Sequence, residues 1–448
     1  AVSDDAVGLR VALGLDDDDD PVSRAELLAS AVVSGQSTLC RAIRQLQAGE
    51  ALLSEGNSLI LRRYFVFRHR LAAPQEEEQL LAGLDTAVME SARRTALFAA
   101  GRPLAIPLSG GYDSRLIAIS LKRLDYRGPM LAYSYGRGGN DEARVSQAVA
   151  RRLGIPWHFV AYDPRVWQSW FCSPVRRGFY RRTHDLVTLP CVQEGPAWAE
   201  LARRGAIGPD VVALPGYSGD LLAGSQIRPV LLEDHPFGEA EMVAFLEQKS
   251  YRYNRRLVPE GPLRRAIRAR IAAVLTDLRL TWPIRTDDVV DVVECWVWQE
   301  RVAKFVVAAC RIYETGGGAW WMPLWDDGLV AFFSGVALEH RQGHRLYRRY
   351  VDARYQEVAG SAVDALPRYK QKWQGELPGL RTLLRPTKRA AFRLVPGLPQ
   401  LDLYLRDPLQ IYGILGLLRY LRLAEGLEHP NAYLVQDLLG LTSFDRRG

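Results

Sequence analysis

A glycine-rich hexapeptide is the part of this sequence best suited to chemistry. It reads Ser-Gly-Gly-Tyr-Asp-Ser over residues 109–114, after the apolar run 103–108 and before a helix-like stretch. A turn in this position exposes unpaired backbone N–H groups at the positive end of a helix dipole, and such turns bind phosphate. Gly110 and Gly111 allow the backbone to approach a ligand closely.

The side chains of the same turn extend this chemistry. Ser109 and Ser114 add hydroxyl donors, and Asp113 supplies a carboxylate that can hold a divalent cation over a polyphosphate. The turn is not a Walker A loop, because no Gly-Lys-Ser/Thr follows, and the dinucleotide pattern GxGxxG is absent. The alternative interpretation is an ordinary turn between a strand and a helix.

Strands that alternate with helices must position this turn. Apolar segments at 103–108, 130–135 and 157–161 predict strands, and the stretches 115–124 and 142–153 between them predict helices. This alternation predicts an α/β fold with a parallel sheet and crossover helices. A further amphipathic helix is predicted from Glu76 to Ala99, and the chain up to about residue 325 is expected to be largely helical.

The regions before and after this α/β region differ from it in composition. Residues 1–73 are predicted to form a small β-rich region with a hairpin within 51–67. Ser23 and Glu26 predict a capping-box helix start there, with the helix running to Val32. We expect a domain boundary near Ala73, a second domain over 74–375, and a basic helical extension over 376–448.

Composition excludes several classes of protein. The 448 residues are 48% hydrophobic and 24% charged, which is typical of a globular protein. No apolar run reaches the ~18 residues that a membrane span needs, and the N-terminus has no signal-peptide pattern. Five cysteines without a CxxC pair predict buried thiols in a reducing compartment, hence a cytoplasmic location. No nucleic-acid-binding module is present, so no nucleic-acid partner is expected.

The positive charge is concentrated near the C-terminus. The net charge is +7, from 58 Lys and Arg against 51 Asp and Glu, and residues 366–448 hold 13 of the former against 7 of the latter. This asymmetry predicts an anionic partner and at most peripheral membrane contact. We expect four cations there to anchor an anionic substrate or a lipid-linked sugar: Arg385, Lys388, Arg389 and Arg393.

With these motifs the sequence resembles the PP-loop ATP pyrophosphatases, and within them the asparagine synthetase-like amide synthetases, which include β-lactam synthetase and lasso-peptide cyclases. The turn at 109–114, the segment 133–143 around Ser134 and the segment 214–224 show the resemblance. It implies a PP-loop fold, ATP and Mg²⁺ as cofactors, and Ser134 among the ATP-binding residues. Residues 38–64 resemble the end of the glutaminase-type domain that precedes the synthetase domain in that family.

The segment 214–224 resembles the second signature of the family. The resemblance makes Asp220 a second Mg²⁺ ligand beside Asp113, and two carboxylates plus phosphate oxygens suit this ion. Gly216 would let the backbone approach the adenine or its ribose. Alternatively, Asp220 only forms a turn or caps a helix.

Tyr217 departs from asparagine synthetases, which have an acid at that position. A tyrosine there is similar to β-lactam synthetase, where it acts with a glutamate as a general base. Glu314, which lies before the segment 321–326, is the expected partner of Tyr217. The alternative is that Tyr217 only packs its ring and that Glu314 pairs with an arginine.

Residues 368–373 resemble the family's Arg-x-Lys-x-x-Phe stretch. By this resemblance Lys370 neutralises charge that develops on the transferred phosphorus and on pyrophosphate. Lys372 is the second choice, and an exposed lysine in a basic tail is the alternative interpretation.

The resemblance implies that ATP activates a carboxylate as an acyl-adenylate, which ammonia or an amine then attacks to form an amide. The family's glutaminase domain uses an N-terminal Cys, whereas this chain begins with Ala1. We therefore expect a fragment, a glutaminase partner, free ammonia or a substrate amine. The motif variants favour a sugar uronic acid as substrate. The alternatives are intramolecular amide closure on a peptide or amino acid, and a non-catalytic adaptor with the same fold.

Overall fold

Five parallel strands form the central sheet of the computed structural model, which describes residues 1–56, 58–69, 76–360, 401, 404–405, 407–423 and 429–441. The strand order is β5-β4-β3-β6-β7. Strands β3 (Leu104–Pro107), β4 (Met130–Gly136) and β5 (Trp157–Ala161) lie where the sequence predicts them. The two-residue strands β6 (Val212–Ala213) and β7 (Ala319–Trp320) were not predicted. The predicted α/β fold class with a parallel sheet is confirmed.

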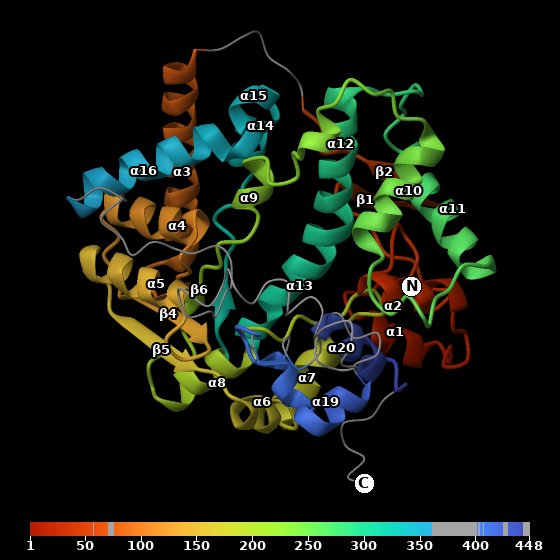
Figure 1. The fold of residues 1–448 in the computed structure, drawn as a ribbon, viewed down its shortest axis with the longest axis horizontal. Helices are drawn as coiled ribbons and strands as arrows, with labels where there is room; N and C mark the ends of the chain where they lie inside the picture. The colour runs from red at the N-terminus through yellow and green to blue at the C-terminus, as the bar shows by residue number, and fades with distance from the viewer. Residues whose placement is uncertain are drawn as a thin grey trace, which may run out of the picture.

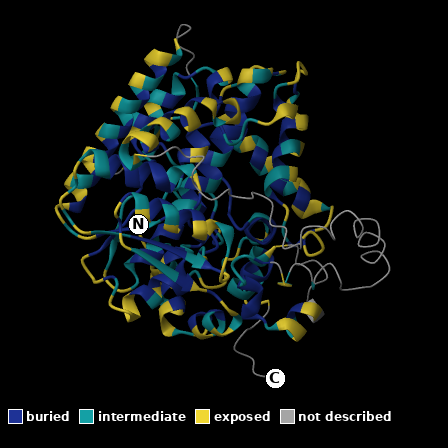
Figure 2. Ribbon diagram, turned by 60° about the vertical axis from the view of Figure 1, so that its left-hand side comes forward, coloured by how far each residue is buried: buried dark blue, intermediate teal, exposed yellow. Residues whose placement is uncertain are grey.

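Both faces of the sheet are buried, as parallel sheets require. Alternate residues along the strands enter two different hydrophobic clusters. The first cluster receives Ala105, Tyr133, Val160 and Ala213. The second receives Leu104, Ile106, Ala132 and Val212. Figure 2 shows the buried residues in the interior and the exposed residues on the outer helices.

Helices cover each face and complete a three-layer arrangement (Figure 1). The second cluster is closed by α3 (Glu77–Ala99), α4 (Tyr112–Arg123), α5 (Asp141–Arg152), α14 (Asp327–Ser334) and α16 (Arg345–Ala359). The first is closed by α6 (Pro164–Phe171), α7 (Pro174–Thr183), α8 (Gly195–Arg203), α10 (Glu239–Ser250), α11 (Pro262–Thr276) and α12 (Thr286–Trp296). The helices predicted at 76–99, 115–124 and 142–153 are thus confirmed as α3, α4 and α5.

Short helical segments connect these elements near the sheet. A π-helix, η2 (Val297–Val306), continues α12 and leads through α13 (Val307–Ala309) into the 3₁₀ turn η3 (Cys310–Glu314). The remaining short segments are α9 (Gly219–Leu222), η1 (Pro229–Leu231), α15 (Leu338–Arg341) and η4 (Gln342–His344).

The N-terminal segment contains α1 (Ala6–Ala12), α2 (Pro21–Ser30) and the antiparallel hairpin of β1 (Glu50–Glu55) and β2 (Ser58–Arg63). The predicted hairpin is therefore present, although helix outweighs strand in this segment. The predicted helix start at Ser23 is wrong, because α2 begins at Pro21 and Asp20 is its N-cap, accepting from the Val22 N–H and the Ser23 hydroxyl. Residues of α2 enter the same cluster as the sheet. The boundary predicted near Ala73 lies outside the described residues.

The described part of the C-terminal region is helical. It contains η6 (Ile411–Ile414), α19 (Leu417–Leu423) and α20 (Pro430–Leu438), whose apolar side chains join the first cluster. The basic residues predicted to anchor an anion, at 385–393, lie outside the described residues. Of the five cysteines, Cys40, Cys295 and Cys310 are buried as predicted, whereas Cys172 is exposed. Within the described ranges, every helix is too short or too polar to cross a lipid bilayer.

Candidate active site

The predicted phosphate-binding turn joins β3 to α4 at the carboxyl end of the sheet. Gly111 is the N-cap of α4, so the backbone N–H groups at the start of this helix face the turn. The Ser114 hydroxyl accepts from the Ser109 N–H at 3.0 Å, and the Ser109 hydroxyl accepts from the Gly111 N–H at 3.0 Å. These two bonds fix the shape of the turn. Its place at the N-terminus of a helix suits the phosphates of ATP.

A cavity of about 260 Å³ opens beside the turn. Its walls come from the ends of β3 and β4, from the loop before α8 and from the turn after β6. It brings together six of the predicted site residues, namely Ser109, Gly111, Asp113, Ser114, Ser134 and Gly216. Tyr217, predicted to be catalytic, lines the same cavity. Gly110 lies in the turn itself, where its N–H donates to the Glu142 carboxylate.

The two predicted Mg²⁺ ligands meet at this turn. The Asp113 carboxylate accepts a hydrogen bond from the backbone N–H of Asp220, which lies at the exposed start of α9. Burial, and then the negative charge of Asp220, raise the pKa of Asp113 to about 7. Two carboxylates whose charges repel one another in this way suit a divalent cation, which removes the repulsion. The residues present thus fit Mg²⁺ bound with a polyphosphate.

Gly216 packs between the two turns of the site. A β-carbon at this position would lie 2.8 Å from the Ser114 nitrogen and 3.2 Å from the Asp113 β-carbon. The absence of a side chain therefore lets the turn after β6 rest on the start of α4. Ser134 is also held by the protein, since its hydroxyl donates to the Leu108 carbonyl at 2.7 Å and its oxygen lies 2.6 Å from the Ser146 hydroxyl.

The structure places Tyr217 next to a glutamate that the sequence analysis did not identify. The Tyr217 hydroxyl donates to Glu194 Oε1 at 3.4 Å. Glu194 Oε2 accepts from the Tyr133 hydroxyl at 2.9 Å and from the Tyr313 hydroxyl at 2.5 Å. Burial raises the pKa of Glu194, and the tyrosine hydrogen bonds lower it in part. Glu194 lines the cavity, and it is a residue of this site that the sequence did not predict.

Glu314, the predicted partner of Tyr217, faces elsewhere. Its Oε2 lies 3.5 Å from Arg311 Nε and its Oε1 accepts from the Trp320 indole at 3.0 Å. The predicted Tyr217–Glu314 pair is therefore wrong, and the alternative that Glu314 pairs with an arginine holds. Lys370 and Lys372, the predicted catalytic lysines, lie outside the described residues.

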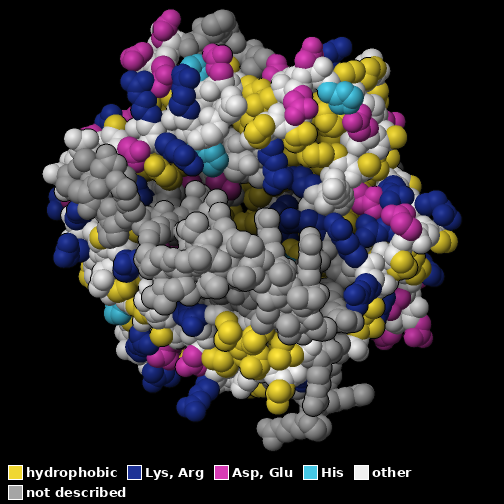
Figure 3. Space-filling model, in the orientation of Figure 1, with side chains coloured by type: hydrophobic (Ala, Val, Ile, Leu, Met, Phe, Trp, Pro, Cys, Tyr) yellow, Lys and Arg dark blue, Asp and Glu magenta, His cyan; other side chains and the backbone are white. Residues whose placement is uncertain are grey.

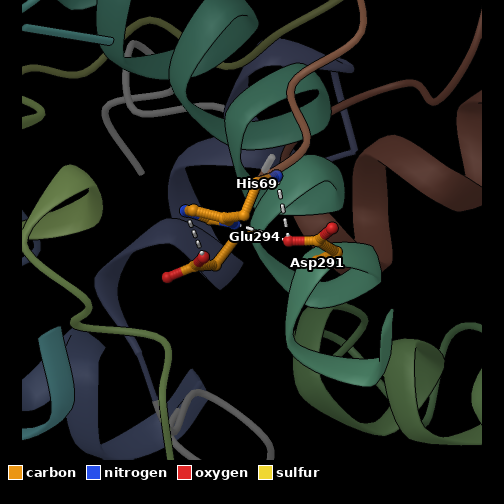
Figure 4. Close-up of side chains that lie close together, drawn as sticks. All are labelled: His69, Asp291 and Glu294. Carbon is orange, nitrogen blue, oxygen red and sulfur yellow. Dashed lines mark hydrogen bonds and ion pairs between the residues drawn. The ribbon is translucent and has the colours of Figure 1, made fainter. Parts of the chain in front are cut away.

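A second cluster of ionisable side chains lies apart from this cavity. His69 Nδ1 is 2.5 Å from Asp291 Oδ1, and His69 Nε2 is 3.4 Å from Glu294 Oε2, as Figure 4 shows. These atoms lie close enough to bind a metal ion. However, Arg341 donates to both oxygens of Glu294, at 3.0 and 2.8 Å. The carboxylate already has a buried cation as its partner, so we assign the cluster to an ion-pair network.

The comparisons with known proteins agree with the geometry of the cavity. The family model described as asparagine synthase matches residues 85–351, which include both turns and the whole parallel sheet. No curated protein matches the chain. The chain therefore belongs to the asparagine synthase family, whose members are ATP-dependent amide-forming synthetases.

Proposed function

We propose that the protein activates a substrate carboxylate with ATP as an acyl-adenylate and transfers the acyl group to ammonia or an amine. The most direct support is the meeting of Asp113 and Asp220 at a glycine turn that forms the N-terminus of α4. A carboxylate does not react with an amine unaided, because oxide is a very poor leaving group. Adenylation supplies AMP as the leaving group.

The residues of the turn position the reacting groups. The N–H groups at the start of α4 and the hydroxyls of Ser109 and Ser114 bind the phosphates that leave as pyrophosphate. Asp113 and Asp220 hold Mg²⁺, which screens the phosphate charge when it is bound. Lys370 or Lys372 neutralises the charge that develops on the leaving group. In this scheme catalysis depends mainly on positioning and electrostatics.

Tyr217 and Glu194 are suited to remove a proton from the nitrogen nucleophile. Burial keeps the pKa of the Tyr217 hydroxyl well above its usual value, so this group is neutral at physiological pH. It therefore passes a proton on rather than acting as a phenolate. Glu194 is the acceptor, because its Oε1 accepts the Tyr217 hydrogen bond and burial, by raising its pKa, makes the carboxylate a stronger base.

The proposed acyl substrate is a sugar uronic acid that becomes a uronamide, with ammonia or an amine as the nitrogen source. The second candidate is intramolecular amide closure, as in β-lactam synthetase, and the Tyr217–Glu194 hydrogen bond favours it. Exchange of labelled pyrophosphate into ATP, driven by uronic acids or by peptides, separates the two. A non-catalytic adaptor would give no exchange with any acid.

Variants of the two carboxylates provide the test of the site. Asp113→Asn and Asp220→Asn are expected to lower carboxylate-dependent exchange at least 100-fold, because loss of a metal ligand removes charge stabilisation in the transition state. Asp210→Asn is the matched control, since Asp210 is an exposed acid outside the cavity. Full exchange in Asp113→Asn would overturn the proposal.

A further inference from the structure

The structure contains a second cavity that is larger than the one at the candidate active site. Its volume is about 570 Å³, and it opens between α10, the turn that follows α10, and the π-helix η2. No residue of the adenylation site described above lines it. Its polar and aromatic lining includes Arg228, Phe245, Lys249, Arg252, Tyr253 and Arg301.

Four cations line this cavity without acidic partners. Among the described residues, none of Arg228, Lys249, Arg252 and Arg301 forms an ion pair with a carboxylate. Lys249 donates to the Gln226 side chain at 2.7 Å, and the Arg301 guanidinium lies 3.7 Å from the centre of the Phe305 ring. Both contacts hold the cation in place and leave its charge uncompensated.

The one acid of the lining does not offset this charge. Glu300 Oε2 accepts from Lys304 Nζ at 2.6 Å and from the Gly35 N–H at 3.1 Å, and all of these groups are buried. The cations also repel one another. Burial, and then the positive charges of Arg228 and Arg252, lower the pKa of Lys249 to about 8. On the face drawn in Figure 3, Lys and Arg side chains gather beside a hollow near the middle of the molecule. The uncompensated positive charge of this cavity attracts a multiply charged anion.

The walls that carry the cations are fixed. The Tyr251 hydroxyl donates to the buried Glu26 at 3.0 Å, and the Trp296 indole donates to the Ser250 hydroxyl at 3.0 Å. Arg301 lies on the π-helix, a conformation that occurs often at functional sites. Cations and aromatic rings that are fixed around a cavity are typical of a small-ligand site rather than of a solvated surface.

Two connections relate this cavity to the adenylation site. The partly buried Cys191 lies within electrostatic range of Arg301, which lines the cationic cavity, and of Glu194, which lines the active-site cavity. The segment after α9 leads from Ala223 to Arg228, and its Ser225 N–H donates to the Asp220 carbonyl at 2.8 Å. Through Cys191 and through this segment, the cationic cavity is linked to residues of the adenylation site.

We propose that the cationic cavity binds a phosphate-bearing part of the acyl substrate, so that the molecule to be amidated carries both a carboxylate and a phosphate ester. The role of the ligand as acyl substrate rests on the proposed function. The negative charge of the ligand is inferred from the cations of the cavity alone. Arg228 and Arg252 lie at the exposed mouth, and Lys249 and Arg301 lie deeper. Arginine suits phosphate in particular, because its planar fork donates two parallel hydrogen bonds.

The experiment measures binding without catalysis. Calorimetric titration of the full chain, without ATP, uses glucuronic acid 1-phosphate as the probe, with glucose 1-phosphate and glucuronic acid as comparisons. We expect both phosphate esters to bind and glucuronic acid to bind at least about tenfold more weakly, because its single charge uses fewer of the cations. Equal binding of glucuronic acid and its 1-phosphate would overturn the proposal.

Variants locate the binding in this cavity. Lys249→Gln/Arg301→Gln is expected to weaken binding of the probe at least about tenfold. Arg265→Gln removes an exposed cation outside the cavity and serves as the control, with unchanged affinity expected. Thermal unfolding verifies that the double variant folds, and relief of repulsion should leave it as stable as the original chain. Unchanged affinity in the folded double variant would overturn the proposal.

The two proposals can fail separately. If pyrophosphate exchange is absent with every acid while phosphate binding depends on Lys249 and Arg301, the proposed function is wrong and the phosphate site stands. If exchange occurs with carboxylates that lack phosphate at the same kcat/KM as with glucuronic acid 1-phosphate, the substrate class proposed here is wrong and the proposed function stands.

Discussion

The hydroxyl of Tyr347 donates a hydrogen bond of 2.7 Å to the Asp113 carboxylate, although 234 residues separate the two in the sequence. Tyr347 is buried on α16, which packs against α4, and its ring lies edge-on to Phe333. The bond orients the carboxylate and favours its charged form, since it lowers the pKa that burial raises. A residue far from the turn thus prepares Asp113 for a cation.

Tyr347→Phe should raise the Mg²⁺ concentration needed for half-maximal pyrophosphate exchange about tenfold. A hydrogen bond to a charged group contributes about 1.5–3 kcal/mol, and the variant removes it while keeping the ring. Tyr355→Phe is the matched control, because Tyr355 is buried on the same helix and its hydroxyl has no hydrogen-bond partner among the described residues. An unchanged Mg²⁺ requirement in Tyr347→Phe would show that the bond does not prepare the site.

Asp113→Asn should stabilise the protein at alkaline pH when Mg²⁺ is removed. The pKa of Asp113 is about 7 in the folded chain against an ordinary value of 3.8, so the folded state holds the proton more tightly than the unfolded state. Stability is therefore lost as pH rises between these two values. In EDTA, thermal unfolding should show the variant more stable by about 1 kcal/mol or more at pH 8, with a smaller difference at pH 5. A variant that is less stable at pH 8 would contradict this assignment.

Local sequence patterns predicted the strand and the helix on either side of the phosphate-binding turn. The apolar run before Ser109 and the helical spacing after it are properties of adjacent residues, so β3, the turn and α4 follow from sequence alone. Strands β6 and β7 have only two residues each, which is too short for any periodicity to appear. They exist because the neighbouring strands supply hydrogen bonds to their backbones.

Glu194 could not be predicted because its environment is assembled from distant segments. Tyr133 comes from β4, Tyr217 from the turn after β6, and Tyr313 from η3. The only local signal is an acid directly before Gly-Pro at the start of α8, which also fits an ordinary helix start. The nearness of Glu314 to the segment 321–326 in sequence favours it as the partner of Tyr217, but the 3₁₀ turn directs it toward Arg311 and Trp320.

Tyr217→Phe should separate the two half-reactions. Loss of the hydroxyl removes the proton path to Glu194, and proton transfer contributes typically 10²–10⁴-fold, so amide formation should fall about 100-fold or more. Pyrophosphate exchange should change less than about threefold, because adenylation needs no proton from the amine. Rapid-quench assays of both steps provide the measurement.

Glu194→Gln should reproduce this effect, and Glu314→Gln is its matched control. Both changes replace a carboxylate by an amide, but only Glu194 lines the cavity. We expect Glu314→Gln to retain amide formation. The reverse result, with Glu314 essential and Glu194 dispensable, would contradict the assignment of the acceptor.

Arg341→Met should destabilise the fold without touching the adenylation site. It leaves Glu294 buried without its cation, and breaking such a pair costs about 3–5 kcal/mol. Glu294→Gln/Arg341→Met should recover much of the loss, because the uncompensated charge is gone. Urea denaturation of the single and double variants measures both effects, and a double variant no more stable than Arg341→Met would exclude charge burial as the cause.

Gly216→Ala tests whether contact between the two turns sets the geometry of the site. The new β-carbon would lie 2.8 Å from the Ser114 nitrogen, and backbone on both sides cannot move aside as a flexible side chain could. Because a displacement of about 1 Å can cost 100-fold in rate, kcat/KM for ATP should fall at least about tenfold. Gly138→Ala is the matched control, since a β-carbon at Gly138 meets nothing within 4 Å. Equal activity of the two variants would mean that the turn after β6 can shift away from α4 and still hold Asp220 where Asp113 needs it.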